Sequence, residues 1–345
     1  MRQATAWSAV LFLGIQLGAG LLLDYGFPFV RFPSAGRVLH GIQDSPEPVD
    51  VVCLGSSRFE WGIRPDEIQR AVQHRLPDVP APVVANAAVP AGDPVSSAYL
   101  LDRMLAEGVR PRIVVIEISP ETITSHTVWM YAHVRRQFRW DDLPGCLLEA
   151  FALKQGVRLL TGRLLPLYEF RQEVLHLLAD LVPDNPDPAP SPADAAAPLV
   201  ANIQREGRAY EIDRTRAWLR EYAVGGRDWH ALNAILARCR EHGIAAVLVG
   251  IPVTGDFRHE VSPAINAAFL TAMDRACRTY GCRFVDCRDR LPDEGFFDIH
   301  HMNDRGAGQF SRLLGAEILA PLWRDLHGSP AAPSDSTLVD HRAEQ

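Results

Sequence analysis

Two short stretches, far apart in the chain, carry side chains that could together perform nucleophilic catalysis. Gly55-Ser56-Ser57 follows the apolar run Val51–Leu54, and Asp298-Ile299-His300-His301 lies near the end of the chain. A serine hydroxyl becomes a strong nucleophile when an imidazole takes its proton, and a carboxylate holds that imidazole in the required tautomer. The first stretch therefore offers a nucleophile, and the second offers a base with its orienting carboxylate.

The elements that must position these side chains form a repeating pattern. Apolar, β-branched runs alternate with helical segments, and the runs are nearly continuous, as is typical of parallel strands covered on both faces. Helices are predicted to begin at Asp93-Pro94, Asp228, Ser262-Pro263 and Asn303-Asp304. The pattern predicts an α/β fold with a doubly wound, five-stranded parallel sheet. The expected strands are Asp50–Leu54, Val83–Asn86, Arg112–Ile118, Ala245–Ile251 and Arg283–Asp286.

Ligands of an open parallel sheet bind outside the carboxyl ends of its strands. The two serines follow the first expected strand, and Asp298 and His301 follow the fifth and precede the last helix. We therefore expect both stretches at the same edge of the sheet. From these residues alone, Ser56 or Ser57 is the candidate nucleophile and His300 or His301 the candidate base.

Three features together resemble the SGNH/GDSL hydrolase superfamily: Gly-Ser-Ser after the first strand, a D-x-x-H-x-N stretch at Asp298–Asn303, and the five-stranded sheet. The resemblance covers roughly Val51–Ile123 and Arg227–Leu322. The apolar N-terminus, G-S-S in place of G-D-S and a helical insert are most similar to the envelope branch. That branch includes alginate O-acetyltransferase-like proteins and the D-alanyl transfer protein of teichoic acid modification.

The resemblance implies a role for each site residue. Ser57 is the nucleophile, Asp298 orients the base and His301 is the base, with Ser56 and His300 as the alternatives. The N–H of Ser57 contributes to the oxyanion hole. Ala88 occupies the place of a family glycine, and Ser119 that of an asparagine; losing one such donor typically lowers the rate by about 10²–10³. The candidates for substrate contacts are Arg58, Asn86 and Asn303.

The N-terminal run Trp7–Leu23 is apolar apart from Ser8 and Gln16. Its 17 residues are close to the roughly 20 that span a bilayer, so it is a membrane anchor or a signal sequence. Arg2 before the run predicts a cytoplasmic N-terminus and an extracytoplasmic (periplasmic or extracellular) remainder. The small residues Ala19-Gly20 lie inside the run instead of after it, which favours an uncleaved anchor.

The sequence predicts five segments. Residues 1–24 are the anchor or signal, 25–49 a connector, and 50–121 with 226–325 the α/β domain. Residues 122–225 are expected to form an inserted helical cap. Within it, 183–198 consists almost wholly of Pro, Asp, Ala, Asn and Ser, and we expect disorder there and in the tail 326–345.

Net charge and cysteine spacing limit the binding partners and cofactors that the chain is expected to have. A formal charge of −7 and a pI near 5.9 give no basic surface for nucleic acid. No cysteine pair has zinc-site spacing, and we expect neither a metal nor a cofactor. In an exported chain, the candidates for a disulfide are Cys239, Cys277 and Cys282; Cys53 and Cys287 are expected as small buried hydrophobes.

The expected activity is that of an extracytoplasmic serine O-acyltransferase or esterase acting on acyl, above all acetyl, groups of an envelope or exported polysaccharide. The resemblance implies a glycan as partner and a membrane-bound acyltransferase as the acyl supplier. The alternative is an inactive module that binds glycan or scaffolds an envelope assembly.

Overall fold

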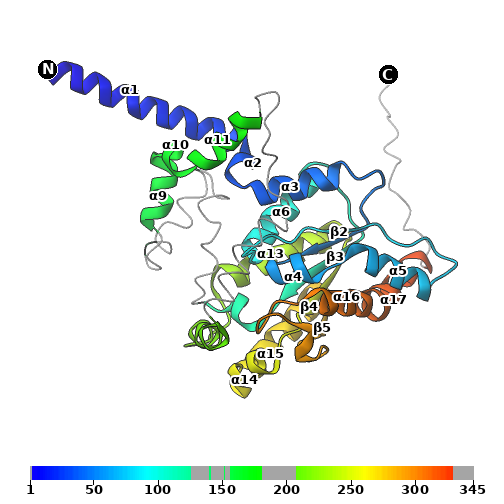
Figure 1. Ribbon diagram of the computed structural model, residues 1–345. Helices are drawn as coiled ribbons and strands as arrows, with labels where there is room; N and C mark the ends of the chain where they lie inside the picture. Colours follow the sequence, from blue (N-terminus) through cyan, green and yellow to red (C-terminus); the bar gives the residue numbers. More distant parts are fainter. Residues whose placement is uncertain (1, 126–139, 141–150, 152–155, 181–206, 329–345) are drawn as a thin grey trace, which may run out of the picture.

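The computed structural model describes residues 2–125, 140, 151, 156–180 and 207–328 (Figure 1). Its centre is a five-stranded, wholly parallel sheet with the order β2-β1-β3-β4-β5. This confirms the predicted fold class, and the predicted strands agree with the structure to within one residue at each end. The strands are β1 (Val51–Leu54), β2 (Val84–Asn86), β3 (Ile113–Ile118), β4 (Ala245–Gly250) and β5 (Arg283–Asp286).

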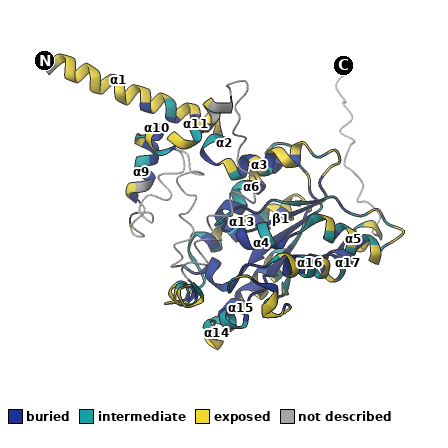
Figure 2. Cartoon of the chain, viewed as in Figure 1, coloured by how far each residue is buried: buried dark blue, intermediate teal, exposed yellow. Residues whose placement is uncertain are grey.

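Alternate strand residues point to opposite faces of the sheet, and helices cover both faces (Figure 2). On one face, Val52 and Val114 pack beneath α3 (Pro33–Gln43), α6 (Pro94–Ala106), α13 (Gly226–Glu241) and α15 (Pro263–Tyr280). On the other, Val51 and Val115 face a second layer. That layer comprises α4 (Ser57–Gly62), α5 (Pro65–Arg75), α14 (Gly255–Glu260), α16 (Asp304–Leu313), η6 (Leu314–Leu319) and α17 (Ala320–Gly328).

The helix ends follow from local chemistry. Asp93, Ser262 and Asn303 are N-caps of α6, α15 and α16, and each side chain accepts a hydrogen bond from a first-turn N–H. Gly281 ends α15 with φ of +73°, a conformation that favours glycine. The helix predicted from Asp228 begins two residues earlier, at Gly226.

The segment 25–49, expected as a connector, contains two helices, α2 (Pro28–Arg31) and α3. The apolar stripe of α3 (Ala35, Leu39 and Ile42) is buried in the core beside α6. Both helices begin with proline, which is well tolerated in the first helical turn.

The N-terminal residues form α1 (Arg2–Leu21), followed by η1 (Leu22–Gly26). Residues Gln3–Gly26 make one helix that is long and apolar enough to cross a membrane, a property that a signal sequence shares.

The inserted region 122–225 begins within η2 (Pro120–Ile123), and its described residues are mainly helical; near its two ends, Thr124 and Val224 form an antiparallel bridge. It contains α9 (Gly156–Leu164), α10 (Pro166–Glu169), α11 (Arg171–Asp180) and helical residues 207–218. The 183–198 loop lies outside the described residues, as does the chain from 329 onward; residues 326–328 of the predicted tail belong to α17.

Candidate active site

Ser57, His301 and Asp298 form one chain of contacts at the carboxyl edge of the sheet. Ser57 Oγ lies 2.9 Å from His301 Nε2, and His301 Nδ1 lies 2.6 Å from Asp298 Oδ2. All three side chains are nearly excluded from solvent. Because the Asp298 carboxylate can only accept, the imidazole carries its proton on Nδ1 and presents a lone pair at Nε2 to the Ser57 hydroxyl. This is the geometry in which an imidazole acts as general base toward a serine.

Asp298 is held as an anion. Its Oδ1 accepts the backbone N–H groups of His300 (2.8 Å) and His301 (2.6 Å). Burial by itself raises the pKa of Asp298, but the hydrogen bond from His301, the two neighbouring imidazoles and the His300 N–H together hold it well below its usual range. The carboxylate is therefore charged at neutral pH and fixed in orientation.

The loop between β5 and α16 carries His301 from the sheet's far edge strand back toward β1. Thr254, just after β4, donates its N–H (3.1 Å) and its hydroxyl (2.8 Å) to the Ile299 carbonyl. An antiparallel bridge between Phe296 and Met302 closes the loop, and Asn303 caps α16. The loop is thus tied at its middle and at its end, with His301 between the two ties.

Two aromatic rings enclose the imidazole. The Phe297 ring stacks on His301 with a centroid separation of 5.5 Å and an interplanar angle of 6°, and Trp61 of α4 lies 4.7 Å away. These rings pack against the His301 imidazole and restrict its rotation.

Glu117 of β3 lies directly beneath the turn that carries Ser56 and Ser57. Its Oε2 accepts the Ser56 N–H (2.8 Å), and its Oε1 accepts the Ser56 hydroxyl (2.8 Å). A Cβ added at Gly55 would come within 2.5 Å of Glu117 Oε2 and 2.7 Å of its Cβ. Because Gly55 has no Cβ, the Glu117 carboxylate can approach the turn and hold it in place. This turn lies between β1 and β3, where the strand order of the sheet reverses and ligands commonly bind.

Arg58, a predicted candidate for substrate contacts, is buried. Its guanidinium pairs with Glu117 (3.2 Å) and with Glu121 (2.6 Å), and its exposed fraction is 3%. Burial lowers the pKa of Arg58, but the two carboxylates outweigh that effect and raise it. Arg58 therefore joins α4, the helix that begins at Ser57, to the end of β3.

The predicted oxyanion donors differ in their availability. The Ser57 N–H, at the first position of α4, has no intrahelical acceptor. The Ala88 N–H donates to Asn86 Oδ1 at 3.2 Å, and the Ser119 hydroxyl donates to Glu121 Oε1 at 2.7 Å. Among the predicted donors, the Ser57 N–H is thus the one with no acceptor in the part of the chain that the structure describes.

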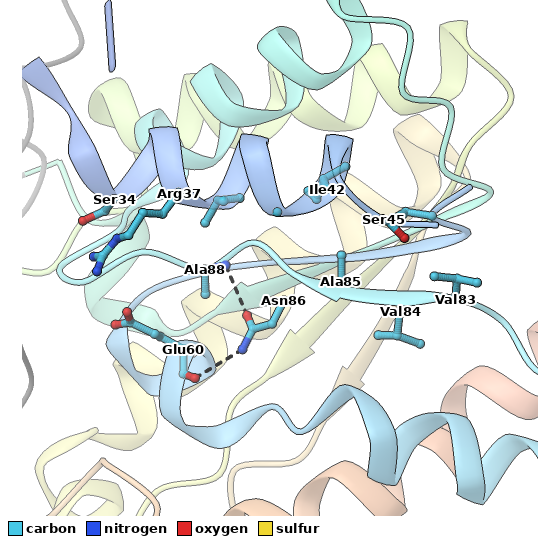
Figure 3. A pocket seen from close by; sticks show the side chains of 13 residues that line it. Ser34, Arg37, Ile42, Ser45, Glu60, Val83, Val84, Ala85, Asn86 and Ala88 are labelled. Atoms are coloured by element: carbon cyan, nitrogen blue, oxygen red, sulfur yellow. Dashed lines mark hydrogen bonds between the residues drawn. The ribbon is translucent and has the colours of Figure 1, made fainter. Parts of the chain in front are cut away.

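Asn86 has a structural set of contacts. Its amide nitrogen donates to the carbonyls of Phe59, Glu60 and Ile63 at the C-terminal end of α4. Asn86 lines a cavity of about 440 Å³. Figure 3 shows its lining residues between α3 and the edge strand β2. Glu60 and Arg37 also line it, and burial raises the pKa of Glu60 to about 7 against the opposing charge of Arg37.

The remaining predicted candidates also have intramolecular contacts. Asn303 accepts from the Gly306 N–H and donates to the carbonyls of Glu294 and Phe296. His300 is buried against Phe257, Trp218 and His301, and Glu211 Oε2 lies 3.9 Å from its Nδ1. Burial and the charge of His301 lower the pKa of His300 well below its usual value. Ser57 and His301, not Ser56 and His300, make the serine–imidazole contact.

Asp298, His300 and His301 also bring three potential metal-ligating atoms within 4.8 Å of one another. Both His301 nitrogens are already engaged, one by Ser57 Oγ and the other by Asp298 Oδ2. The same atoms cannot serve metal ligation and the serine–imidazole–carboxylate chain together, and the observed contacts are those of the chain.

Several site residues were absent from the sequence prediction: Glu117, Glu121, Trp61, Phe297 and Thr254. Glu117 had a recognisable signature, a carboxylate inside the wholly buried strand Ile113–Ile118, since buried carboxylates require partners. The others have no local signature, because their roles depend on contacts with residues distant in the chain.

No protein-family model matches the sequence, and no curated protein matches it. Among solved structures, the chain is similar to LAE5, an alpha/beta hydrolase enzyme from the metagenome of Lake Arreo, Spain, with 13% identity, TM-score 0.36 and coverage of 78% of this chain and 94% of the other. It is also similar to Axe2, an acetylxylan esterase from Geobacillus stearothermophilus, with 11% identity and a TM-score of 0.36. The match covers 78% of this chain and 94% of Axe2. A third similar structure is TesA, with 13% identity, a TM-score of 0.34, and coverage of 79% of this chain and 99% of TesA. At these identities the similarity concerns the fold alone.

Proposed function

We propose that this chain is an SGNH-type serine esterase or O-acyltransferase, with Ser57 as nucleophile, His301 as general base and Asp298 as the group that orients His301. The observation that carries the proposal is the continuous set of contacts Ser57 Oγ–His301 Nε2 and His301 Nδ1–Asp298 Oδ2. Hydrogen-bonded serine, imidazole and carboxylate side chains in this order are the arrangement that activates a serine for acyl transfer.

The reaction proceeds in two halves. Ser57 Oγ attacks the acyl carbonyl carbon while its proton passes to His301 Nε2, and the carbonyl π electrons move to the oxygen, near the Ser57 N–H. Collapse of this intermediate breaks the ester C–O bond, and the departing alcohol takes the proton from His301. Water or a second hydroxyl then attacks the acyl-serine by the same steps, which gives hydrolysis or acyl transfer.

The substrate in this proposal is an acyl ester, above all an acetyl ester, of a cell-envelope or exported polysaccharide. Support comes from α1, which would hold the α/β domain beside a membrane with its N-terminus on the cytoplasmic side. A membrane-bound acyltransferase would supply acyl groups. The resemblance to the envelope branch of the superfamily supports the same assignment.

A second candidate function is an inactive module that binds glycan or scaffolds an envelope assembly. The observation that favours it is the engagement of two predicted oxyanion donors, the Ala88 N–H and the Ser119 hydroxyl, by other side chains. Each missing donor typically lowers the rate by about 10²–10³.

Turnover of p-nitrophenyl acetate and labelling by a fluorophosphonate probe separate these functions. The wild type should label and turn over, and Ser57→Ala should lose the label and at least about 10³-fold in kcat. Ser56→Ala is the matched variant and should still label. Labelling that survives in Ser57→Ala but not in Ser56→Ala would move the nucleophile to Ser56, and a wild type that does not label would favour the inactive module.

A further inference from the structure

Exposed large apolar side chains are concentrated in two parts of the described chain. One is the stretch from Trp7 to Phe27, and the other is the insertion, where Val157, Leu164, Tyr168, Leu175 and Leu178 are between 46% and 70% exposed. In the described α/β domain, the comparable residues are Leu270 and Phe297, at 37% and 36%. Such a concentration of apolar surface marks a region that another apolar phase covers.

The two parts are in contact. In Figure 1, α9 and α10 lie beside the C-terminal half of α1, and both helices contact it. The side chain of Gln16 accepts the Leu167 N–H at 3.3 Å and is 7% exposed. A Cβ added at Gly20 would lie 3.4 Å from Pro166 Cγ. Gln16 and Gly20 thus lie on the face of α1 that receives α10.

A buried charge cluster holds this arrangement. Asp24 Oδ1 lies 2.8 Å from Arg31 Nη1 and 2.7 Å from Arg163 Nη1, with all three side chains at most 2% exposed. Arg31 belongs to α2 and Arg163 to α9, so one carboxylate joins the end of the N-terminal helix to the insertion. Removing one member of such a buried cluster is strongly destabilising, which makes the junction specific.

The position of the α10 contact along α1 determines how deep α10 would lie in a membrane that α1 spans. Gln16 lies ten residues before Gly26, the end of the apolar helix, which corresponds to about 15 Å at 1.5 Å per residue. The hydrocarbon core of a bilayer is about 30 Å thick. If α1 spans a membrane, α10 therefore lies within the half of the bilayer that adjoins the α/β domain, not beyond its surface.

We infer that α9, α10 and α11 enter the membrane leaflet beside the C-terminal half of α1, with lipid acyl chains covering their exposed apolar side chains. This inference rests on the membrane location of α1 in the proposed function. The Arg171 guanidinium, 4.8 Å from the Tyr168 ring centroid, suits the headgroup boundary. The inference also requires that α1 is retained in the mature protein, since cleavage after Gly20 would remove Gln16 and Gly20, the two residues that contact α10.

The test uses the full chain in nanodiscs that hold one copy each, made of phosphatidylcholine and phosphatidylglycerol with brominated acyl chains. A fluorophore sensitive to bromine quenching is attached in turn to Leu13→Cys, Leu175→Cys and Leu270→Cys, in a background with Cys146 and Cys277 replaced. Burial raises the pKa of Cys53, Cys239, Cys282 and Cys287 to about 12, which suppresses their labelling. We expect quenching of at least about two-fold at positions 13 and 175, and none at 270.

If position 13 is quenched but position 175 is quenched no more than position 270, the inference is overturned. The assignment of α1 as a membrane anchor would then still stand. Quenching at neither 13 nor 175 would overturn the anchor and the inference together. Gly20→Leu should abolish quenching at 175 while retaining it at 13, because the larger side chain excludes α10. Gly14→Leu is the matched control: no atom of the described residues lies within 4 Å of a Cβ built there, so quenching at both positions should persist.

Discussion

Glu117 accepts hydrogen bonds from both the backbone N–H and the hydroxyl of Ser56, the residue that immediately precedes the serine in contact with His301. One carboxylate on β3 thereby defines the turn after β1. It also pairs with Arg58, the residue after Ser57. The residues on both sides of Ser57 are therefore held by the same buried side chain.

Glu117→Ala should lower both stability and activity. It leaves Ser56 without its acceptor and Arg58 with Glu121 as its remaining ion-pair partner, and removing one member of a buried ion pair costs about 3–5 kcal/mol. Urea unfolding measures the first effect and ester turnover the second. Glu121→Ala is the matched variant: it removes an Arg58 partner but not a Ser56 contact, so its loss of kcat per unit of lost stability should be smaller. Equal ratios for the two variants would contradict a positioning role for Glu117.

Asp298→Asn should lower kcat by about 10⁴ with little change in the melting temperature. The amide oxygen can still accept the N–H groups of His300 and His301, while the amide NH₂ faces His301 Nδ1 and favours the tautomer that protonates Nε2. Activity and thermal unfolding measured on one preparation check this. A large fall in melting temperature with a small fall in kcat would show that Asp298 mainly maintains the loop.

His300 should make the folded state less stable as the solution becomes acidic. Its pKa is lowered in the folded protein by burial and by the charge of His301, whereas an unfolded histidine gains a proton near pH 6.5. The stability contributed by His300 is therefore complete above about pH 6.5 and is lost as pH falls toward the lower folded pKa, by at most about 1.4 kcal/mol per pH unit.

The corresponding variant is His300→Phe, which suits the aromatic surroundings of Phe257 and Trp218. Urea unfolding at pH 7 and pH 5 should show a smaller loss of stability in the variant than in the wild type. Parallel losses in both proteins would contradict the assignment of this pH dependence to His300.

Cys277 and Cys282 should form a disulfide in protein recovered from an oxidising compartment. Their sulfur atoms lie 3.3 Å apart as free thiols, across the left-handed turn at Gly281. Closing so short a loop stabilises the fold by about 2 kcal/mol in the chain-entropy model. Alkylation followed by mass spectrometry, with Cys277→Ser as control, detects the bridge. Complete alkylation of both residues in membrane-isolated protein would argue against an extracytoplasmic location.

Much of the fold was predictable from the sequence because its determinants are local. Mainly apolar, nearly continuous runs marked the five strands, and capping residues such as Asp93, Ser262 and Asn303 marked helix starts. The segment 25–49 was predicted less well, since its helices are stabilised by packing of Leu39 and Ile42 into the core more than by propensity.

The sequence by itself determined the order of strands and helices and the pairing of two distant stretches at one sheet edge. Parallel strands have a fixed polarity, so residues that follow β1 and β5 must emerge on the same side. It also offered both serines and both histidines without distinguishing their contacts.

The tertiary structure decided which of them meet, because that depends on the Thr254–Ile299 tie and on Glu117, which engages Ser56. It likewise decided that Arg58 is an internal ion-pair partner and that Gln16 and Gly20 receive the insertion. Each of these outcomes depends on contacts between segments more than 40 residues apart, which no local pattern encodes.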